Sequence, residues 1–431
     1  MVRKSSNILE RFLLFATIGV LPLQWYYPTF LGMSIGFIVF SCSAGYILIF
    51  RLGMLQKILL HPVFLSGYAL VAIGIFMELA HHSAGFTEIL RIFFMLLGAI
   101  VIATLCRDRK ALRWAIYGYL FAGVWLSFIL IQTTYGTLNT AKADDFRSAS
   151  HLRESVYDEN PLDADPNTMA FFAGQGAVVA LGLGLMAKSL WLRGLFLGLG
   201  VFCLIATFLP MSRGGVLVLG LSCALIMYAH GIMKPRIFIA VGILALGMTI
   251  WVPDVVFQRF TLSGDTRIGA REEGRTRVYS AVVKHFPDYA LTGVGITHFY
   301  GQWGRQTKLW KDYEVTGTHN CFAQITVYWG VMGLFALVIL VWQVYLCIPS
   351  FYKNHAFTLC LVGVAVSVLG QVMLVHTLYA KEFSLLLGLM VGGSYWIWPK
   401  GRMPARSLTR TLSCQDASII SSQRSVPALP S

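Results

Sequence analysis

The chain has 431 residues, of which 56% are hydrophobic and only 13% are charged. This composition excludes a water-soluble enzyme, a disordered scaffold and a secreted disulfide protein, because none of these carries so much apolar sequence. The formal net charge of +14 would favour nucleic-acid binding in a soluble chain. In a membrane protein, however, the distribution of basic residues between loops decides what the charge means.

Twelve apolar runs follow one another along the chain, and a run of about 20 such residues can cross the hydrocarbon core of a bilayer. The first run follows a basic N-terminus and has no small-residue cleavage site after it, so we interpret it as a retained span. The sequence therefore predicts an all-α polytopic membrane protein with about 12 transmembrane helices. The runs are 12–27, 30–50, 60–79, 89–106, 112–134, 167–187, 191–210, 214–230, 236–253, 321–348, 356–376 and 383–399.

The runs divide the chain into groups of spans, two long loops and a tail. Both loops exceed the length of ordinary connections, which is typical of functional or disordered segments. The tail is rich in Ser, Arg and Pro and has no periodicity, so we expect it to be disordered. The predicted segments are spans 1–5 in residues 1–134, a loop in 135–166, spans 6–9 in 167–253, a larger loop carrying short surface helices in 254–320, spans 10–12 in 321–399 and a cytoplasmic tail in 400–431.

Basic residues gather in alternate short loops, which assigns those loops and both termini to the cytoplasm. The loops 135–166 and 254–320 are then exported. The first is acidic but also holds Arg147 and Arg153. The second carries more basic than acidic residues, and long exported loops escape the positive-inside bias, so these side chains are available for another task.

The larger loop contains a helix-like stretch from Arg275 to Phe286. Its apolar residues fall on one face, which predicts an ordered helix lying on the membrane surface. That face is formed by Val278, Ala281, Val282, His285 and Phe286.

The sequence holds no Gly-rich phosphate loop, no dinucleotide fingerprint and no Cys/His metal cluster. We therefore expect neither a cofactor nor a bound metal. The polar residues gather at the exported face, where ATP is absent. A reaction at that face must draw its energy from an already activated substrate.

Ser212-Arg213-Gly214-Gly215 lies between two strongly apolar runs and puts a guanidinium at the exported membrane edge. One interpretation is a snorkelling anchor that reaches the lipid headgroups. The other, which we favour, is an anion site. Arg contacts phosphate in a bidentate manner, and two glycines let the backbone approach a ligand closely.

Two arginines open the predicted surface helix. Arg275 falls on the same face as Val278 and Val282, and an inward-facing Arg at a membrane surface needs an anionic partner. Arg277 lies off that face, where contact with lipid headgroups is an equal alternative.

His319-Asn320 ends the larger loop, directly before the span that starts at Cys321. A lone histidine is often structural. At the membrane–water boundary beside a basic loop, however, an imidazole can take a proton from a hydroxyl group near neutral pH. The sequence therefore makes His319 a candidate general base.

Together these residues resemble the O-antigen ligase family, within the larger group of bacterial lipid-linked glycan ligases and polymerases. His319-Asn320, nine further residues and then Gly330 to Gly333 fit the ligase pattern of His, Asn/Ser/Gln, nine residues, Gly, two residues and a small residue. Ser212-Arg213-Gly214 is similar to the family's Ser-Arg-Gly at the start of a span.

Three further segments resemble the family's motifs. Residues 274–279 are similar to its Gly-Arg followed by an aromatic residue, and 291–295 resemble its Leu-x-Gly-x-Gly segment. Residues 165–167 resemble the Asn-bearing start of an earlier span. The family often has Pro before Leu-x-Gly-x-Gly, where this chain has Ala290. The motifs cover 165–335, and the first five spans match in hydropathy alone.

The resemblance implies a metal-independent, inverting glycosyltransferase of the bacterial inner membrane that acts in lipopolysaccharide biosynthesis. It would move a preassembled glycan from undecaprenyl diphosphate to a sugar hydroxyl of lipid A-core, on the periplasmic face where both exported loops would lie. His319 would be the general base, and Arg213 and Arg275 would grip the diphosphate. Further candidates for substrate binding are Asn320, Arg277, Ser212, Arg147 and Arg153.

Two other functions remain open. A polymerase of the same fold would extend O-antigen or exopolysaccharide chains, but the spacing Arg, ten residues, Gly that is typical of polymerases does not occur in the exported loops. A polysaccharide transporter would place polar residues near the bilayer midplane, where the predicted spans hold Gln175, Gln371 and a few small polar residues. The expected partners are the lipid-linked donor, the lipid A-core acceptor and membrane lipid, without nucleic acid.

Overall fold

The structure, a computed structural model, describes residues 6–20, 34–140, 166–229, 278–307, 318, 320–348, 356–374 and 381–397. In these residues every regular element is a helix, and no strand occurs. Six of the described helices are long and apolar enough to cross a membrane, or seven if a bent pair counts as one further span. The predicted all-α polytopic membrane protein is confirmed in this form. The count of twelve spans stays a prediction, because it includes residues outside the described part.

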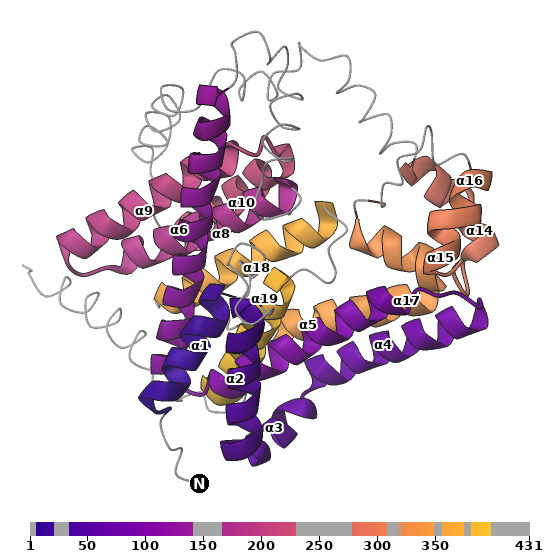
Figure 1. Cartoon of the computed structure of the whole chain (residues 1–431), viewed down its shortest axis with the longest axis horizontal. Coiled ribbons are helices and arrows are strands. Elements are labelled where there is room, and N and C mark those ends of the chain that lie inside the picture. The colour runs from indigo at the N-terminus through magenta and orange to yellow at the C-terminus, as the bar shows by residue number, and fades with distance from the viewer. Residues whose placement is uncertain are drawn as a thin grey trace, which may run out of the picture.

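The N-terminal helices follow the predicted apolar runs (Figure 1). Five of them begin within five residues of the predicted start, because the apolar stretch that suits the membrane also sets the extent of the helix. Pro62 opens α4 in its first turn, where the missing N–H of proline has no intrahelical partner to lose. The bounds are α1 Ile8–Val20, α2 Ile35–Phe50, α3 Leu52–Leu59, α4 Pro62–Ala80, α5 Phe86–Leu105 and α6 Arg109–Thr140.

Helix α3 has no counterpart among the predicted spans. It follows α2 with a bend of 104° at Arg51. The Arg51 guanidinium and that of Arg107 both donate to Glu10 of α1, whose side chain is fully buried. Arg51 and Arg107, which lie in short loops predicted to be cytoplasmic, therefore also link the start of α1 to the ends of α2 and α5.

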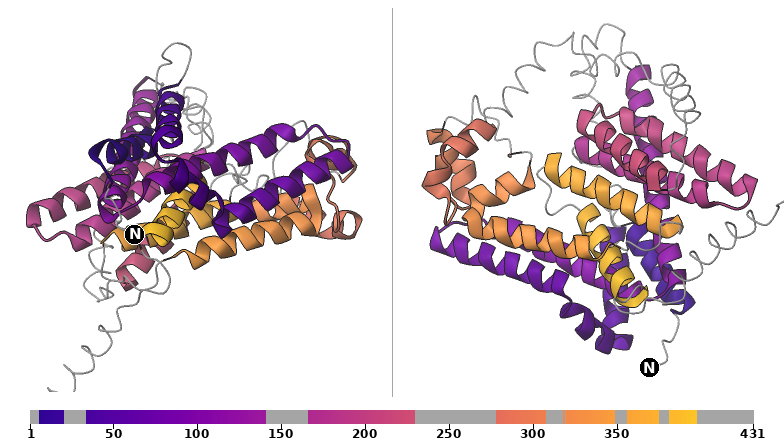
Figure 2. Two further views of the ribbon diagram at one scale, coloured as in Figure 1. Left: turned by 90° about the horizontal axis from the view of Figure 1, so that it is seen from below. Right: turned by 180° about the vertical axis from the view of Figure 1, so that it is seen from behind.

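Helices α8–α10 and α17–α19 complete the bundle, as Figure 2 shows from two sides. Helix α8 packs against α6, α9, α10 and α18. Its approach to α6 depends on two facing glycines, since a Cβ on Gly123 would lie 2.6 Å from the Cα of Gly176. Small residues bring membrane helices close enough for their backbones to pack. The bounds are α8 Pro166–Met186, α9 Leu190–Phe208, α10 Arg213–Ala229, α17 Cys321–Leu346, α18 Ala356–Leu374, α19 Lys381–Gly392 and the π-helix η3 Gly393–Ile397.

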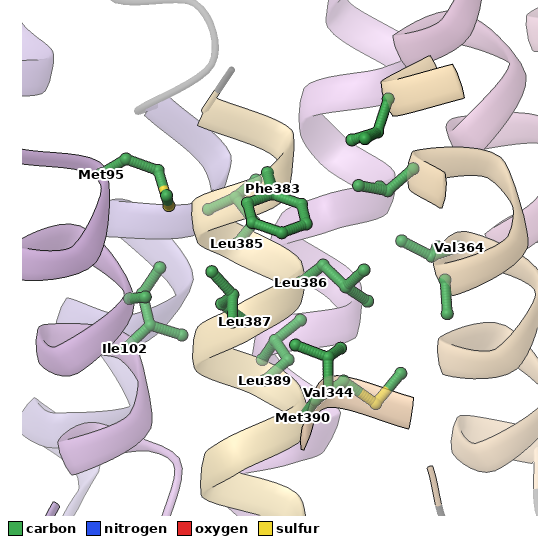
Figure 3. Close-up of a cluster of buried hydrophobic side chains, with 14 of the residues drawn as sticks. Met95, Ile102, Val344, Val364, Phe383, Leu385, Leu386, Leu387, Leu389 and Met390 are labelled. Carbon is green, nitrogen blue, oxygen red and sulfur yellow. The ribbon is translucent and has the colours of Figure 1, made fainter. Parts of the chain in front are cut away.

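Helix α19 is buried on all sides from Glu382 to Gly392. Figure 3 shows its apolar side chains between Met95 and Ile102 of α5 and Val364 of α18. A helix that is apolar all round is typical of a protein interior. Helix α19 therefore forms the core around which α5 and α18 are arranged.

More polar groups lie inside the bundle than the apolar runs indicate. Tyr119 of α6 donates a hydrogen bond to Gln175 of α8, and both side chains are fully buried. Glu382, at the start of α19, is also buried. The interior thus includes an acidic residue at the boundary of the last predicted span, in addition to the two glutamines noted in the sequence.

Short helices form a separate cluster beside the turn between α4 and α5 (Figure 1). Residues 278–284 are helical and are followed by α14 Phe286–Tyr289, α15 Ile296–His298, η2 Phe299–Trp303 and α16 Gly304–Gln306. Part of the larger predicted loop is therefore ordered into short helices, as expected.

The contact between α6 and α8 predicts a site-specific loss of stability. Gly123→Leu should lower the free energy of unfolding by about 1–3 kcal/mol, the usual effect of overpacking. The reason is that the new side chain would collide with the α8 backbone at Gly176. Thermal unfolding in detergent measures the change. Gly136→Leu, in the same helix, is the control, since a Cβ there meets no atom within 4 Å. Equal melting temperatures for the two variants would contradict this account of the packing.

Candidate active site

Ser212 joins the starts of two helices. Its hydroxyl donates to the Asn167 side-chain oxygen of α8 at 2.9 Å and accepts from the Gly215 backbone N–H of α10 at 3.2 Å. The side chain is buried, and the preceding Met211 has the unusual φ of 56° for a residue other than glycine. Such a left-handed residue costs about 1–2 kcal/mol. The turn between α9 and α10 is thus held in a strained form that places Ser212 as the cap of α10.

Arg213 is the first residue of α10 and is partly exposed. The two glycines after it have neighbours within the protein: a Cβ on Gly215 would lie 2.8 Å from Ala170 Cβ, and one on Gly214 would lie 3.3 Å from Leu374. The sequence interpretation gave these glycines the task of admitting a ligand to the backbone. In the structure they admit α8 and α18, so their small size is explained by helix packing.

Asn320 holds the start of α17 against the end of α18. Its side-chain oxygen accepts from the Ala323 N–H at 3.0 Å, which caps the helix, and its amide nitrogen donates to the Met373 carbonyl at 3.0 Å. The buried Thr318 hydroxyl donates to the Asn320 carbonyl at 2.8 Å. Asn320, predicted to bind substrate, therefore makes two hydrogen bonds that fix the backbone beside His319.

These contacts bring three helix starts together. Ser212 links α8 to α10, Gly214 lies against Leu374 at the end of α18, and Asn320 ties α17 to the residue before Leu374. The first turn of each helix has N–H groups without intrahelical partners, equivalent to roughly half a positive charge. Arg213 adds a full positive charge at the same place. Ser212 and Asn320 cap two of these starts, and the C-terminal end of α18 adds a partial negative charge, so Arg213 is the main basis for considering this end of the bundle a candidate anion site.

Helix α17 is broken near its start, and Figure 1 shows a sharp bend between its two parts. Trp329 and Gly330 have non-helical backbone angles, with a φ of 65° at Gly330. The segment 290–295 lies in this break. Val294 and Gly295 donate N–H groups to the carbonyls of Val327 and Tyr328 at 2.8 and 2.9 Å. In return, the carbonyl of residue 290 accepts from the Val331 N–H at 2.7 Å. We call this arrangement of 290–295 and 327–331 the α17 clamp.

The α17 clamp gives a physical reason for two of the sequence motifs. Gly293 has a φ of 73°, and a Cβ on it would lie 2.2 Å from the Tyr328 carbonyl oxygen. A Cβ on Gly330 would lie 2.4 Å from the Leu291 carbonyl oxygen. Gly293 of the Leu-x-Gly-x-Gly segment and Gly330, which follows His319-Asn320 after nine intervening residues, therefore allow the two backbones to pack directly against each other. Ala290, at a φ of −53°, holds the backbone shape that a proline in its place would impose.

A chain of hydrogen bonds beside the clamp, with Gln324 and Tyr328 buried and Tyr300 partly buried, was not expected from the sequence. Gln324 donates to the Tyr328 hydroxyl at 2.5 Å, and Tyr328 donates to the Tyr300 hydroxyl at 2.8 Å. Burial raises the pKa of Tyr300 above its ordinary value, which keeps this hydroxyl protonated near neutral pH, although the bond from Tyr328 acts in the opposite direction. The i, i+4 spacing of Gln324 and Tyr328 is the only sequence signal of this chain, and it is a weak one.

The predicted surface helix is described from residue 278 onward. Val278 and Ala281 are buried and pack with Val282 and Trp303, so that part of the apolar face is confirmed. Phe286 is 41% exposed and was wrongly placed on this face. The helix ends before it because Pro287 has no N–H to continue the hydrogen-bonding pattern, and Phe286 instead opens α14.

Several predicted site residues lie outside the described part of the chain. They are His319, Arg275, Arg277, Arg147 and Arg153. Of the predicted residues, the structure describes Ser212, Arg213 and Asn320, and it brings these three to one end of the bundle. In the part of the chain with described coordinates, no group of three His, Cys, Asp or Glu residues has the arrangement of a metal site.

Comparison with known proteins gives one family match. Residues 195–338 match the model of a family described as O-antigen ligase. The matched segment runs from α9 through the α17 clamp, and it confirms the family resemblance that the motifs indicate. A search of curated proteins found no match to this chain.

The two hydrogen bonds of Ser212 predict a measurable effect. Ser212→Ala should lower the free energy of unfolding by about 1–2 kcal/mol, because it removes a helix cap and a bond between helices. Thermal unfolding in detergent measures this, and Ser212→Thr should retain most of the stability. The control is Ser66→Ala, because Ser66 is partly exposed and its hydroxyl donates to the Pro62 carbonyl of its own helix. Wild-type stability of Ser212→Ala would refute the role of this residue.

Proposed function

We propose that this chain, whose residues 195–338 belong to the O-antigen ligase family, is a glycosyltransferase that moves a preassembled glycan from undecaprenyl diphosphate to a sugar hydroxyl of lipid A-core. The family supports an enzyme of the ligase and polymerase group that uses lipid-linked glycans. The donor, the acceptor and a periplasmic active site in the inner membrane belong to the proposal.

One observation carries the proposal furthest: Arg213 lies where the starts of α8, α10 and α17 meet the end of α18. Transfer from a lipid diphosphate leaves negative charge on the departing phosphate oxygens. Fixed positive groups aimed at that charge stabilise the transition state. The gathering of helix starts around an arginine supplies such groups at an edge of apolar helices, where a lipid-linked donor is held.

The reaction is a direct displacement at the anomeric carbon. His319 takes the proton from the acceptor hydroxyl, and the hydroxyl oxygen forms a bond to the anomeric carbon from the side opposite the diphosphate. The bond between that carbon and the diphosphate oxygen breaks, and undecaprenyl diphosphate leaves with the electron pair. The configuration at the carbon is therefore inverted.

Arg213 and Arg275 hold the diphosphate and neutralise its growing charge, which makes a divalent metal unnecessary. Arg277, Arg147 and Arg153 are further candidates for this contact. Asn320 contributes by fixing the backbone next to His319, and Ser212 does the same next to Arg213. A requirement for added divalent metal in transfer by the purified protein would contradict this part of the proposal.

The role of His319 predicts a separation of binding from chemistry. His319→Ala should reduce transfer by at least about 100-fold, the usual effect of removing a general base, while the lipid-linked donor still binds. Transfer between purified donor and acceptor in detergent, together with donor binding, measures both effects. His285→Ala is the matched control, because His285 belongs to the same predicted loop, 254–320, and its ring lies within hydrogen-bond distance of Asp288, at 3.0 Å. Normal transfer by His319→Ala would exclude His319 as the base.

The products of the same assay separate the proposal from its nearest rival. A ligase yields lipid A-core capped with one preassembled glycan. A polymerase yields a ladder of glycans that differ by one repeat unit, and that result would replace the proposed acceptor.

The diphosphate contact predicts that Lys cannot replace Arg213. Arg213→Ala should raise the KM for the donor, lower kcat, or both. Arg213→Lys keeps the charge but loses the forked geometry of the guanidinium, so it should recover only part of that loss. Steady-state kinetics with varied donor measure this. Arg193→Lys is the control, since Arg193 is an exposed residue of α9 whose guanidinium bonds to the Ala187 carbonyl. Wild-type kinetics in Arg213→Lys would show that bidentate contact is not required.

A further inference from the structure

Glu78 is a fully buried carboxylate near the end of α4, outside the family-matched segment 195–338. Its Oε1 accepts two hydrogen bonds, from the Ile296 backbone N–H at 2.9 Å and from the Trp329 indole N–H at 3.1 Å. Burial of a carboxyl group is costly unless hydrogen bonds replace its lost hydration, and among the described residues Oε1 has these two donors while Oε2 has none. The positions of these two donors therefore indicate the structural role of Glu78.

Those donors belong to the two sides of the α17 clamp. Trp329 is the residue at which α17 breaks, and Ile296 directly follows the segment 290–295 that lies in the break. A single oxygen atom thus joins the inserted segment to the broken helix. The backbone bonds of the clamp hold the two strands of chain to each other, and Glu78 holds both of them to α4.

The end of α4 is shaped to receive the clamp. A Cβ on Gly74 would lie 2.7 Å from the Trp329 ring, so only glycine leaves room for the indole beside Glu78. In the turn after α4, Ser83 accepts from the Thr297 N–H at 3.1 Å, and the His81 ring lies 2.9 Å from the Thr292 carbonyl oxygen. Helix α4 and the turn after it therefore contact the chain on both sides of Ile296, at Thr292 and at Thr297.

The clamp controls where the first part of α17 points. Nine residues separate Asn320 from Trp329, which at helical rise is about 14 Å. Over that length a tilt of about 4° at the break moves the other end by about 1 Å. Misplacement of reacting groups by about 1 Å can reduce a rate by about 100-fold. The orientation of Trp329 is therefore transmitted to Asn320, which directly follows His319 in the sequence.

We propose that Glu78 is a positioning residue of the transfer reaction, which orients the first part of α17 through the Ile296 amide and the Trp329 indole. The inference rests on the proposed function, because the group that it positions is the proposed base His319. Because Glu78 is fully buried, it acts through these two donors, so its effect should fall on kcat and leave donor binding intact.

Three variants at the contact and one control test this inference. Glu78→Leu removes the acceptor, Glu78→Gln keeps an oxygen that both donors can use, and Trp329→Phe removes only the indole N–H. We expect Glu78→Leu to lower kcat by about 100-fold with a donor KM within about twofold of wild type. Glu78→Gln should recover most of kcat, and Trp329→Phe should lie between the two. The control Glu88→Gln alters a partly exposed pair with Arg91 and should match wild type.

Backbone hydrogen exchange supplies a readout that is independent of transfer. Peptides covering 290–297 and 321–331 should exchange slowly in the wild type and in Glu78→Gln, and faster in Glu78→Leu. Equal exchange in all variants, or a normal kcat in Glu78→Leu, would overturn the inference. So would a Glu78→Gln variant that fails to recover kcat although it folds and binds donor. If the wild type transfers no glycan, the proposed function fails, and the exchange result alone decides whether Glu78 holds the clamp.

Discussion

The pairing of buried backbone groups is the constraint on which this structure depends. A buried N–H or C=O group without a partner costs free energy comparable to a lost hydrogen bond, so a helix cannot be broken in the interior unless another part of the chain completes its hydrogen bonds. The break in α17 frees such groups around Gly330, and the segment 290–295 pairs with them. The backbones approach so closely that glycine is required at Gly293 and Gly330. The segment 290–295 is therefore an integral part of the broken helix.

The clamp begins a series of contacts that reaches the proposed diphosphate site. It orients the first part of α17, Asn320 ties the start of that part to α18, and the end of α18 packs against the glycines after Arg213. Ser212 then links α10 to α8. Each link is one or two hydrogen bonds or a close packing contact, and together they connect α4 to the start of α8. Residues of the early spans thus help to arrange the groups proposed to act in catalysis.

Hydropathy predicted most of the described helices because the thickness of the membrane sets the length of an apolar run, and Arg213 stood out because charge is rare between such runs. The break in α17 could not be predicted from hydropathy, because the run 321–348 is apolar throughout and the sign of φ at Gly330 leaves no trace in it. Glu78 was passed over for a similar reason. One acidic residue at the end of the run 60–79 marks the boundary of a span, and its partners are far away in the sequence. The glycines after Arg213 were noticed, but only the packed structure shows that helices α8 and α18 approach them.

The separation of Glu78 from its partners has a consequence for the order of synthesis. Its two donors lie 218 and 251 residues further along the chain. At typical rates of about 5–20 residues per second, the ribosome needs about 10–50 s to reach Trp329 after it has made Glu78. During that interval, Glu78 lacks its donors Ile296 and Trp329, and the Trp329 ring that packs against Gly74 has not yet been made. The early helices must therefore tolerate an unfinished polar site, and the α17 clamp is completed only after the chain has been made as far as Val331.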